Sequence, residues 1–154
     1  MECTANELYQ IAEVEVIYKS KVKASQRPLI STTKDAYNVF LQVWDKNKIE
    51  LLEEFKAIFL NKANRLLCVY HLSSGGITGT IADIRLLFSV ALKTATCAIV
   101  VCHNHPSGNL KPSRQDEEIT QRIKNAGKLL EIQVLDHIIL SSEGYLSFAD
   151  EGLL

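Results

Sequence analysis

The sequence lacks the features that mark several large classes of protein. It has four cysteines, which form no C-x-x-C pair and are too sparse for a disulfide framework: Cys3, Cys68, Cys97 and Cys102. Such free thiols are typical of the reducing cytoplasm. Glu2 and Glu7 interrupt the stretch where a signal peptide would carry its apolar segment, and the apolar runs are too short to cross a bilayer. We therefore expect a cytoplasmic protein without membrane contacts.

The chain also lacks a surplus of basic charge. Its 154 residues include 17 Lys and Arg against 18 Asp and Glu, which gives a net charge of -1. Domains that bind nucleic acid usually carry a basic surplus, so the composition gives no reason to expect DNA or RNA. A short basic stretch is typical of a solvated arm: Lys19, Lys21, Lys23 and Arg27. With 47% hydrophobic and 23% charged residues, the chain is typical of one compact domain.

Strand-like and helix-like patterns alternate along the chain and predict an α/β domain. Helices are expected to start near Ser31, Thr80 and Ser113, whose hydroxyls can cap a helix N-terminus. Strands are expected over residues 13–18, 53–60, 65–72, 98–102, 132–140 and 145–148. The second and third strands form a hairpin. The fourth is a continuous apolar run, as in a central strand, and the fifth is read as a second buried strand. We expect residues 1–30 to form an arm that could add an edge strand, and residues 31–154 to form the domain.

The segment 103–116 combines two histidines with an acidic helix start. His103 and His105 are two residues apart, so their imidazoles point the same way if the strand continues past Cys102. Cys102 and Asn104 then face the other side of the strand, which makes Cys102 a poor ligand. The two histidines can therefore share one metal ion.

A Pro/Gly turn at residues 106–108 allows the chain to turn back after the histidines. Pro112 and Ser113 then begin a helix whose first turn carries Asp116 toward the imidazoles. Two nitrogens and one carboxylate oxygen suit Zn²⁺, and three protein ligands leave a coordination position open, as in hydrolytic sites. Ser113 and Asp116 alone could be a helix cap, but a cap explains neither histidine. The H-x-E with P-C-x-x-C pattern of zinc deaminases and the H-E-x-x-H motif are absent from the sequence.

These residues give the chain a resemblance to a known family. His103-x-His105-Pro106, followed by Ser113-x-x-Asp116, resembles the JAMM motif of the MPN+/JAB metalloproteases. More closely, the chain is similar to the JAB domain of the bacterial RadC family. The further matching segments are Glu53-x-Phe55, Phe59-Leu60-Asn61, residues 74–80, residues 103–108, Leu135-Asp136-His137 and Phe148-Ala149. The resemblance covers residues 30–154 without the helix-hairpin-helix segment of longer RadC proteins, so a short, stand-alone form is expected.

The resemblance implies a cytidine-deaminase-like fold, a three-layer α/β/α domain with a mixed central sheet. It also implies a set of zinc ligands: His103, His105 and Asp116. Ser113 would support the oxyanion in such a site. The upstream glutamate that acts as general base in this family falls on Glu53, with Glu54 as the alternative. Because neighbours on a strand point to opposite faces, only one of these two acids can reach the metal.

Other polar residues have two interpretations. Without the motif, Glu53 and Glu54 would be read as an exposed strand start. Asp136 and His137 lie in an apolar strand, where one of them could orient a ligand imidazole. The two could equally satisfy their own hydrogen bonds in the core. His71 is expected at the surface of the hairpin.

The function implied by the resemblance is zinc-dependent hydrolysis of a peptide or isopeptide bond, with a peptide or protein as substrate. One alternative is a non-enzymatic, DNA-associated module, suggested by the family's link to DNA repair. The balanced charge disfavours that alternative. A second alternative is a scaffold that keeps the fold without catalysis; such scaffolds generally lose the metal ligands, and this chain has all three. The sequence predicts no oligomeric state.

Overall fold

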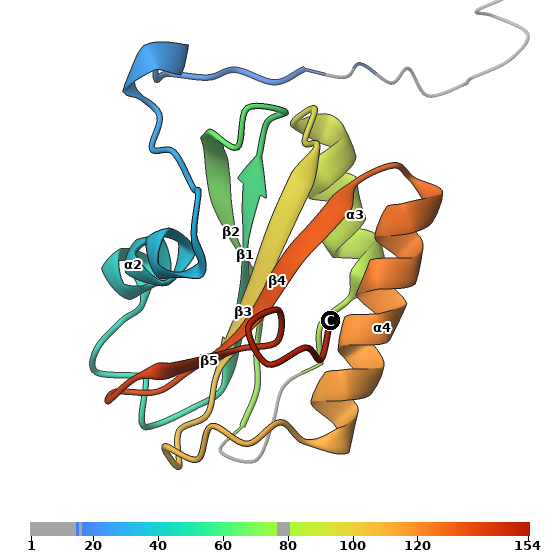
Figure 1. The fold of residues 1–154 in the computed structure, drawn as a ribbon. Coiled ribbons are helices and arrows are strands. Elements are labelled where there is room, and N and C mark those ends of the chain that lie inside the picture. Colours follow the sequence, from blue (N-terminus) through green and yellow to red (C-terminus); the bar gives the residue numbers. More distant parts are fainter. Residues whose placement is uncertain (1–14, 16, 77–80) are drawn as a thin grey trace, which may run out of the picture.

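The computed structural model describes residues 15, 17–76 and 81–154 (Figure 1). The elements follow in this order: η1 (Ala24–Gln26), α2 (Thr33–Val43), β1 (Glu54–Leu60), β2 (Leu66–Ser74), α3 (Ile84–Lys93), β3 (Ala98–Asn104), α4 (Arg114–Leu129), β4 (Gln133–Leu140) and β5 (Tyr145–Ser147). Among the described residues, no helix is both long and apolar enough to span a bilayer. Cys68, Cys97 and Cys102 are free thiols, in agreement with the sequence-based expectation.

The strands form one mixed sheet in the order β2-β1-β3-β4-β5. β1 and β2 form the predicted hairpin, and β1 is also antiparallel to β3. β3 and β4 are parallel, so the chain between them must cross one face of the sheet, and α4 makes this crossing. β1 and β3 are buried along their whole length, as expected for central strands that are covered on both faces.

Helices cover both faces of the sheet: α2 lies on one face, and α3 and α4 lie on the other (Figure 1). Side chains alternate between the two faces along each strand, so two cores form. Ile58 and Val100 pack with Phe40 of α2, whereas Phe59 and Ile99 pack with residues of α3 and α4. The predicted three-layer α/β/α architecture with a mixed sheet is therefore confirmed.

Two helices begin at other residues than the sequence predicts. Thr32 caps α2, because its hydroxyl accepts the N–H of Asp35 at 3.2 Å while the Asp35 carboxylate accepts the N–H groups of Ser31 and Thr32. The prediction of Ser31 is wrong by one residue, since Asp35 completes a capping box with Thr32. Asp83 caps α3. Thr80, predicted for that role, lies outside the described residues.

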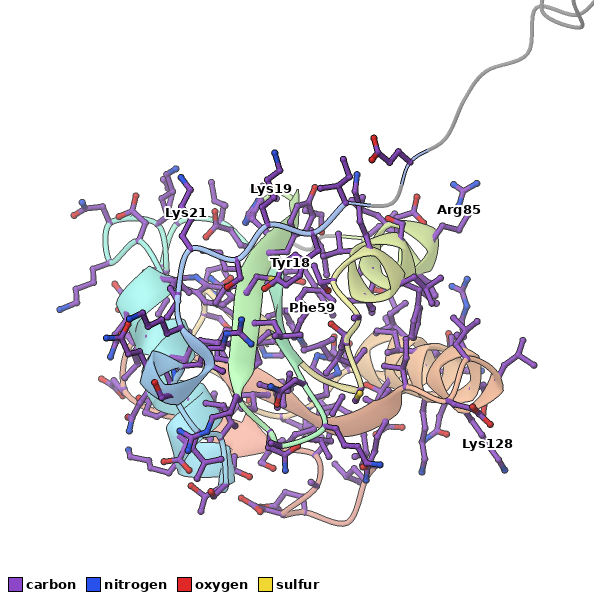
Figure 2. All side chains as sticks on the ribbon, turned by 90° about the horizontal axis from the view of Figure 1, so that it is seen from above. Tyr18, Lys19, Lys21, Phe59, Arg85 and Lys128 are labelled. Carbon is purple, nitrogen blue, oxygen red and sulfur yellow. The ribbon has the colours of Figure 1, made fainter. Side chains whose placement is uncertain are left out.

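The N-terminal segment runs across one end of the sheet, close to β2 (Figures 1 and 2). The hydroxyl of Tyr18 donates to the carbonyl of Leu67 in β2 at 3.4 Å. Of residues 13–18 the structure describes 15, 17 and 18, and none of these lies in a strand, so the predicted strand is wrong at those positions. Lys19 and Lys21 are exposed, as predicted for a solvated basic arm.

A buried ion pair lies between β1 and the end of α2. The ammonium of Lys56 is 3.2 Å from the carboxylate of Glu54, and the two side chains are 9% and 7% exposed. Lys56 also donates to the carbonyl of Val43 at 3.3 Å and lies 4.3 Å from the ring centroid of Trp44. The carboxylate of Glu54 is thus paired with Lys56 on the α2 face of the sheet.

We expect the Glu54→Gln variant to lose about 3 kcal/mol of unfolding free energy, because it leaves the buried ammonium of Lys56 without its counter-charge. Adding Lys56→Met to this variant should restore most of the loss. Urea unfolding followed by circular dichroism measures both effects. Glu118→Gln is the matched control, since its pair with Arg114 is exposed and such pairs contribute about 0.5 kcal/mol or less. Equal effects of the two glutamine substitutions would contradict this account.

Candidate metal centre

The ends of two parallel strands place the histidines. β3 continues to Asn104, as the metal-site hypothesis requires, and His103 at its end is 1% exposed. The N–H of His105 donates to the carbonyl of Leu140, the last residue of β4, at 2.9 Å. The chain then turns at Gly108, whose φ is 81°, a left-handed conformation that glycine adopts without strain. The two imidazoles therefore project from a rigid edge of the sheet.

The start of α4 places the acidic residue of the group. Ser113 is the N-cap, and its hydroxyl accepts the N–H of Asp116 at 3.1 Å. In return, the Asp116 carboxylate accepts the N–H of Ser113 at 2.7 Å. This predicted capping box is confirmed. It holds the carboxylate at a helix N-terminus, where the helix dipole favours negative charge.

The three side chains meet as a group that could hold a metal ion. Nε2 of His103 is 3.0 Å from Nε2 of His105 and 3.1 Å from Oδ1 of Asp116. Nε2 of His105 is 3.4 Å from Oδ2 of Asp116. Tetrahedral zinc with bonds of about 2.0–2.2 Å separates its ligand atoms by about 3.3 Å. The donor set and its spacing therefore fit such an ion.

The electrostatics of this group favour a cation. Burial by itself raises the pKa of Asp116, but hydrogen bonds from His103 and His105 outweigh burial and hold that pKa well below its usual range. The hydrogen bond with Asp116 raises the pKa of His105 against the effect of burial, and the carbonyl of Asn109 and the charge of Glu53 add to the rise. The carboxylate thus stays ionised and available to a positive ion.

Each histidine makes a further contact through its other ring nitrogen. Nδ1 of His105 is 2.5 Å from the carbonyl of Asn109, so Nδ1 carries the proton and Nε2 faces Asp116. Nδ1 of His103 is 2.8 Å from Nε2 of His137. Burial, with the charge of His103, lowers the pKa of His137 well below its ordinary value, so that ring is neutral. Contacts of this kind orient metal ligands.

Asp136 and His137 are neighbours on β4 and face opposite sides of the sheet. His137 contacts His103, whereas the carboxylate of Asp136 accepts the hydroxyl of Ser147 at 2.5 Å and that of Thr33 at 3.2 Å. Burial raises the pKa of Asp136 against the effect of these hydrogen bonds. Of the two interpretations considered from the sequence, the contact with a candidate ligand histidine falls on His137, and the hydrogen bonds within the core fall on Asp136.

A cavity of about 640 Å³ opens beside the three candidate ligands, and Glu53 and Ser113 both line it. Glu54 instead pairs with Lys56 on the opposite face of the sheet. Of the two glutamates considered from the sequence, Glu53 is thus the one that the structure places at the cavity. His71 is exposed on β2 and contacts Ser74.

Asn104 has no role in the sequence-based hypothesis, yet it fixes the chain on both sides of Glu53. Its buried amide donates to the carbonyls of Ile49 at 2.7 Å and Leu52 at 2.9 Å, and its side-chain oxygen accepts the N–H of Glu54 at 2.7 Å. The sequence feature that could have pointed to this role is the polar side chain itself. It lies at an inward-facing position of a buried strand, where a polar group needs hydrogen-bond partners.

Residues 30–153 match the model of a family described as the RadC-like JAB domain. The chain belongs to this family. The matched range includes α2 to β5 and therefore every residue of the group around the cavity. This match confirms the family that was expected from the sequence. The α/β fold of the chain is consistent with that family.

Several similar proteins carry the name UPF0758 protein, which states no activity. One from Flavobacterium johnsoniae is 42% identical over 124 residues, which are 80% of this chain and 53% of the relative. One from Syntrophotalea carbinolica is 36% identical over 147 residues, 93% of this chain and 64% of the relative. A third, from Methanosarcina mazei, is 35% identical over 125 residues, 81% of this chain and 53% of the relative. The chain thus spans between half and two thirds of the length of these relatives.

We expect the Asn104→Ala variant to lose about 3 kcal/mol of unfolding free energy, because three backbone groups in buried or part-buried bonds lose their partner. Chemical unfolding in urea measures this loss. Asn47→Ala is the matched control, since Asn47 is exposed, and its stability should stay near that of the wild type. A wild-type midpoint for Asn104→Ala would show that the amide does not fix this segment.

Proposed function

We propose that this RadC-like JAB domain is a zinc-dependent hydrolase of peptide or isopeptide bonds. The proposal is carried by one observation: two histidines, an aspartate and a serine from one segment of the chain meet a distant glutamate at one cavity. The JAMM-like spacing of His103, His105, Ser113 and Asp116 supports an amide bond as the target.

His103, His105 and Asp116 would hold the ion. Two imidazole nitrogens with one carboxylate oxygen favour Zn²⁺ over Mg²⁺ or Ca²⁺, which prefer oxygen ligands. When bound, zinc supplies a Lewis acid that polarises a carbonyl and allows water to act as a nucleophile near neutral pH. With three protein ligands, the site leaves room for water or substrate.

Glu53 is the general base in this proposal. Its side chain is half-buried and lines the cavity, and Asn104 holds the backbone on both sides of it. A carboxylate in this place can take a proton from water and pass it to the leaving amine, which needs a proton in order to depart. Glu54 serves as the partner of Lys56 instead.

Ser113 is the oxyanion donor in this proposal. Its oxygen accepts the N–H of Asp116, so the hydrogen of its own hydroxyl is left to donate. The side chain is exposed at the cavity wall. A donor there can stabilise the negative charge that develops on the carbonyl oxygen of an amide during attack.

The substrate in this proposal is a segment of peptide or protein. The cavity wall combines the apolar side chains of Phe55, Ile81 and Ile119 with the cationic side chains of Lys111 and Arg122. A wall of this kind suits a ligand that has a polar backbone and varied side chains. The volume of about 640 Å³ lies within the range of clefts that bind ligands.

Protein purified without chelators is expected to contain about one zinc ion per chain, and His103→Ala and Asp116→Ala should lose it because only two ligands then remain. Elemental analysis by mass spectrometry measures the content, and thermal unfolding checks that each variant is folded. His71→Ala is the matched control, since His71 is exposed and contacts Ser74. Full zinc content in both ligand variants would overturn the assignment.

Glu53→Gln is expected to keep its zinc and to lose at least about 100-fold in kcat, the usual contribution of a general base. A mixed library of quenched fluorescent peptides and isopeptide-linked peptides provides the assay. Glu50→Gln is the control, because Glu50 is exposed and bonds to Ser142. Undiminished cleavage by the Glu53 variant would move the base to another residue.

A further inference from the structure

A chain of hydrogen bonds leads from the backbone of α4 to the imidazole of His103. The hydroxyl of Thr120 is 2.5 Å from the carbonyl of Asp116, one turn earlier in the helix, and 2.6 Å from Nδ1 of His137. Nε2 of His137 is 2.8 Å from Nδ1 of His103. Thr120 is 1% exposed and His137 is 0% exposed, so water does not compete for these atoms.

The direction of the first bond in this chain is fixed. A carbonyl oxygen accepts hydrogen bonds and never donates, and two oxygens at 2.5 Å repel each other unless a hydrogen lies between them. Thr120 must therefore donate its single hydroxyl hydrogen to the carbonyl of Asp116. Its oxygen is left to accept, so the proton of the second bond belongs to Nδ1 of His137.

The second and third bonds then follow from the first. The ring of His137 packs between Phe55 and Phe148, with ring centroids at 5.5 and 4.7 Å, and this apolar setting disfavours a second ring proton. With its proton on Nδ1, His137 can only accept through Nε2. His103 must donate through Nδ1, which leaves Nε2, 3.1 Å from Oδ1 of Asp116, as the ring nitrogen that can bind a metal ion.

We propose that Thr120 and His137 are positioning residues that set the tautomer of His103, so that Nε2 is its metal-binding atom. This inference rests on the proposed zinc site. Two imidazoles can share a hydrogen bond in either direction, and the reverse direction would place a proton on Nε2 of His103 and block a metal ion. Thr120 removes this ambiguity, because its own bond to a carbonyl cannot be reversed. His105 donates to a carbonyl directly and needs no such partner.

The tautomer of His137 tests the proposal in the wild-type protein. The chain has four histidines, so nitrogen-15 spectra of the imidazole rings can be assigned residue by residue, with and without added zinc. We expect His137 to be protonated at Nδ1 and bare at Nε2 in both states. A proton on Nε2 of His137 would overturn the proposal, whether or not the protein cleaves peptides.

Two substitutions of Thr120 separate the hydroxyl from the shape of the side chain. Thr120→Val removes the hydroxyl, allows His137 to change tautomer, and should weaken zinc binding roughly 10- to 100-fold. Thr120→Ser keeps the hydroxyl and should keep the wild-type tautomer and affinity. Competition with a chromophoric chelator measures the affinity. Thr94→Val is the matched control, since it removes a hydroxyl that bonds to the carbonyl of Val90, also one turn back, at 2.8 Å.

Each outcome of this comparison decides the proposal. Wild-type zinc affinity in Thr120→Val, or an equal loss in Thr94→Val, would overturn it. If Thr120→Val does not fold, as judged by thermal unfolding, the spectra of the wild type and of Thr120→Ser decide instead. Neither readout uses a substrate, so absence of peptidase activity would count against the proposed function and leave this inference standing.

Discussion

The group around the cavity depends on the parallel pairing of β3 with β4. Because both strands run in the same direction, the chain must return from the end of β3 to the start of β4, and α4 makes this return. The N-terminus of α4 therefore lies beside the end of β3. This constraint brings Asp116 opposite His103 and His105, and it directs the positive end of the helix dipole to the same place.

The alternation of side chains along strands divides neighbouring residues between two tasks. Glu53 lines the cavity, while Glu54 pairs with a lysine beneath α2. His137 contacts a candidate ligand, while Asp136 accepts hydrogen bonds in the opposite core. Asn104 lies between two candidate ligands and faces away from both to hold another segment. Each strand that reaches the cavity thus also carries the polar contacts that keep it in place.

The candidate ligands could be predicted from the sequence because their geometry is local. His103 and His105 share one face of one strand, and a capping signal places Asp116 in the first turn of a helix. The contacts that support them are not local: Asn104 bonds to residues 50 to 55 positions away, and His137 is 34 positions from His103. The periodic pattern of apolar residues in the sequence does not predict such pairs, because they depend on strand register and on which helix covers each face. The choice between the two glutamates was open for the same reason.

The carboxylate of Asp116 belongs to two structures at once, since it closes the capping box and faces both imidazoles. Binding of a cation here would therefore be linked to fraying of the first turn of α4, because both equilibria would involve the same anion. A change that neutralises or displaces this anion shifts both. The order of this helix start would then change with the occupancy of the centre, and the helix terminus would report locally on a bound ion.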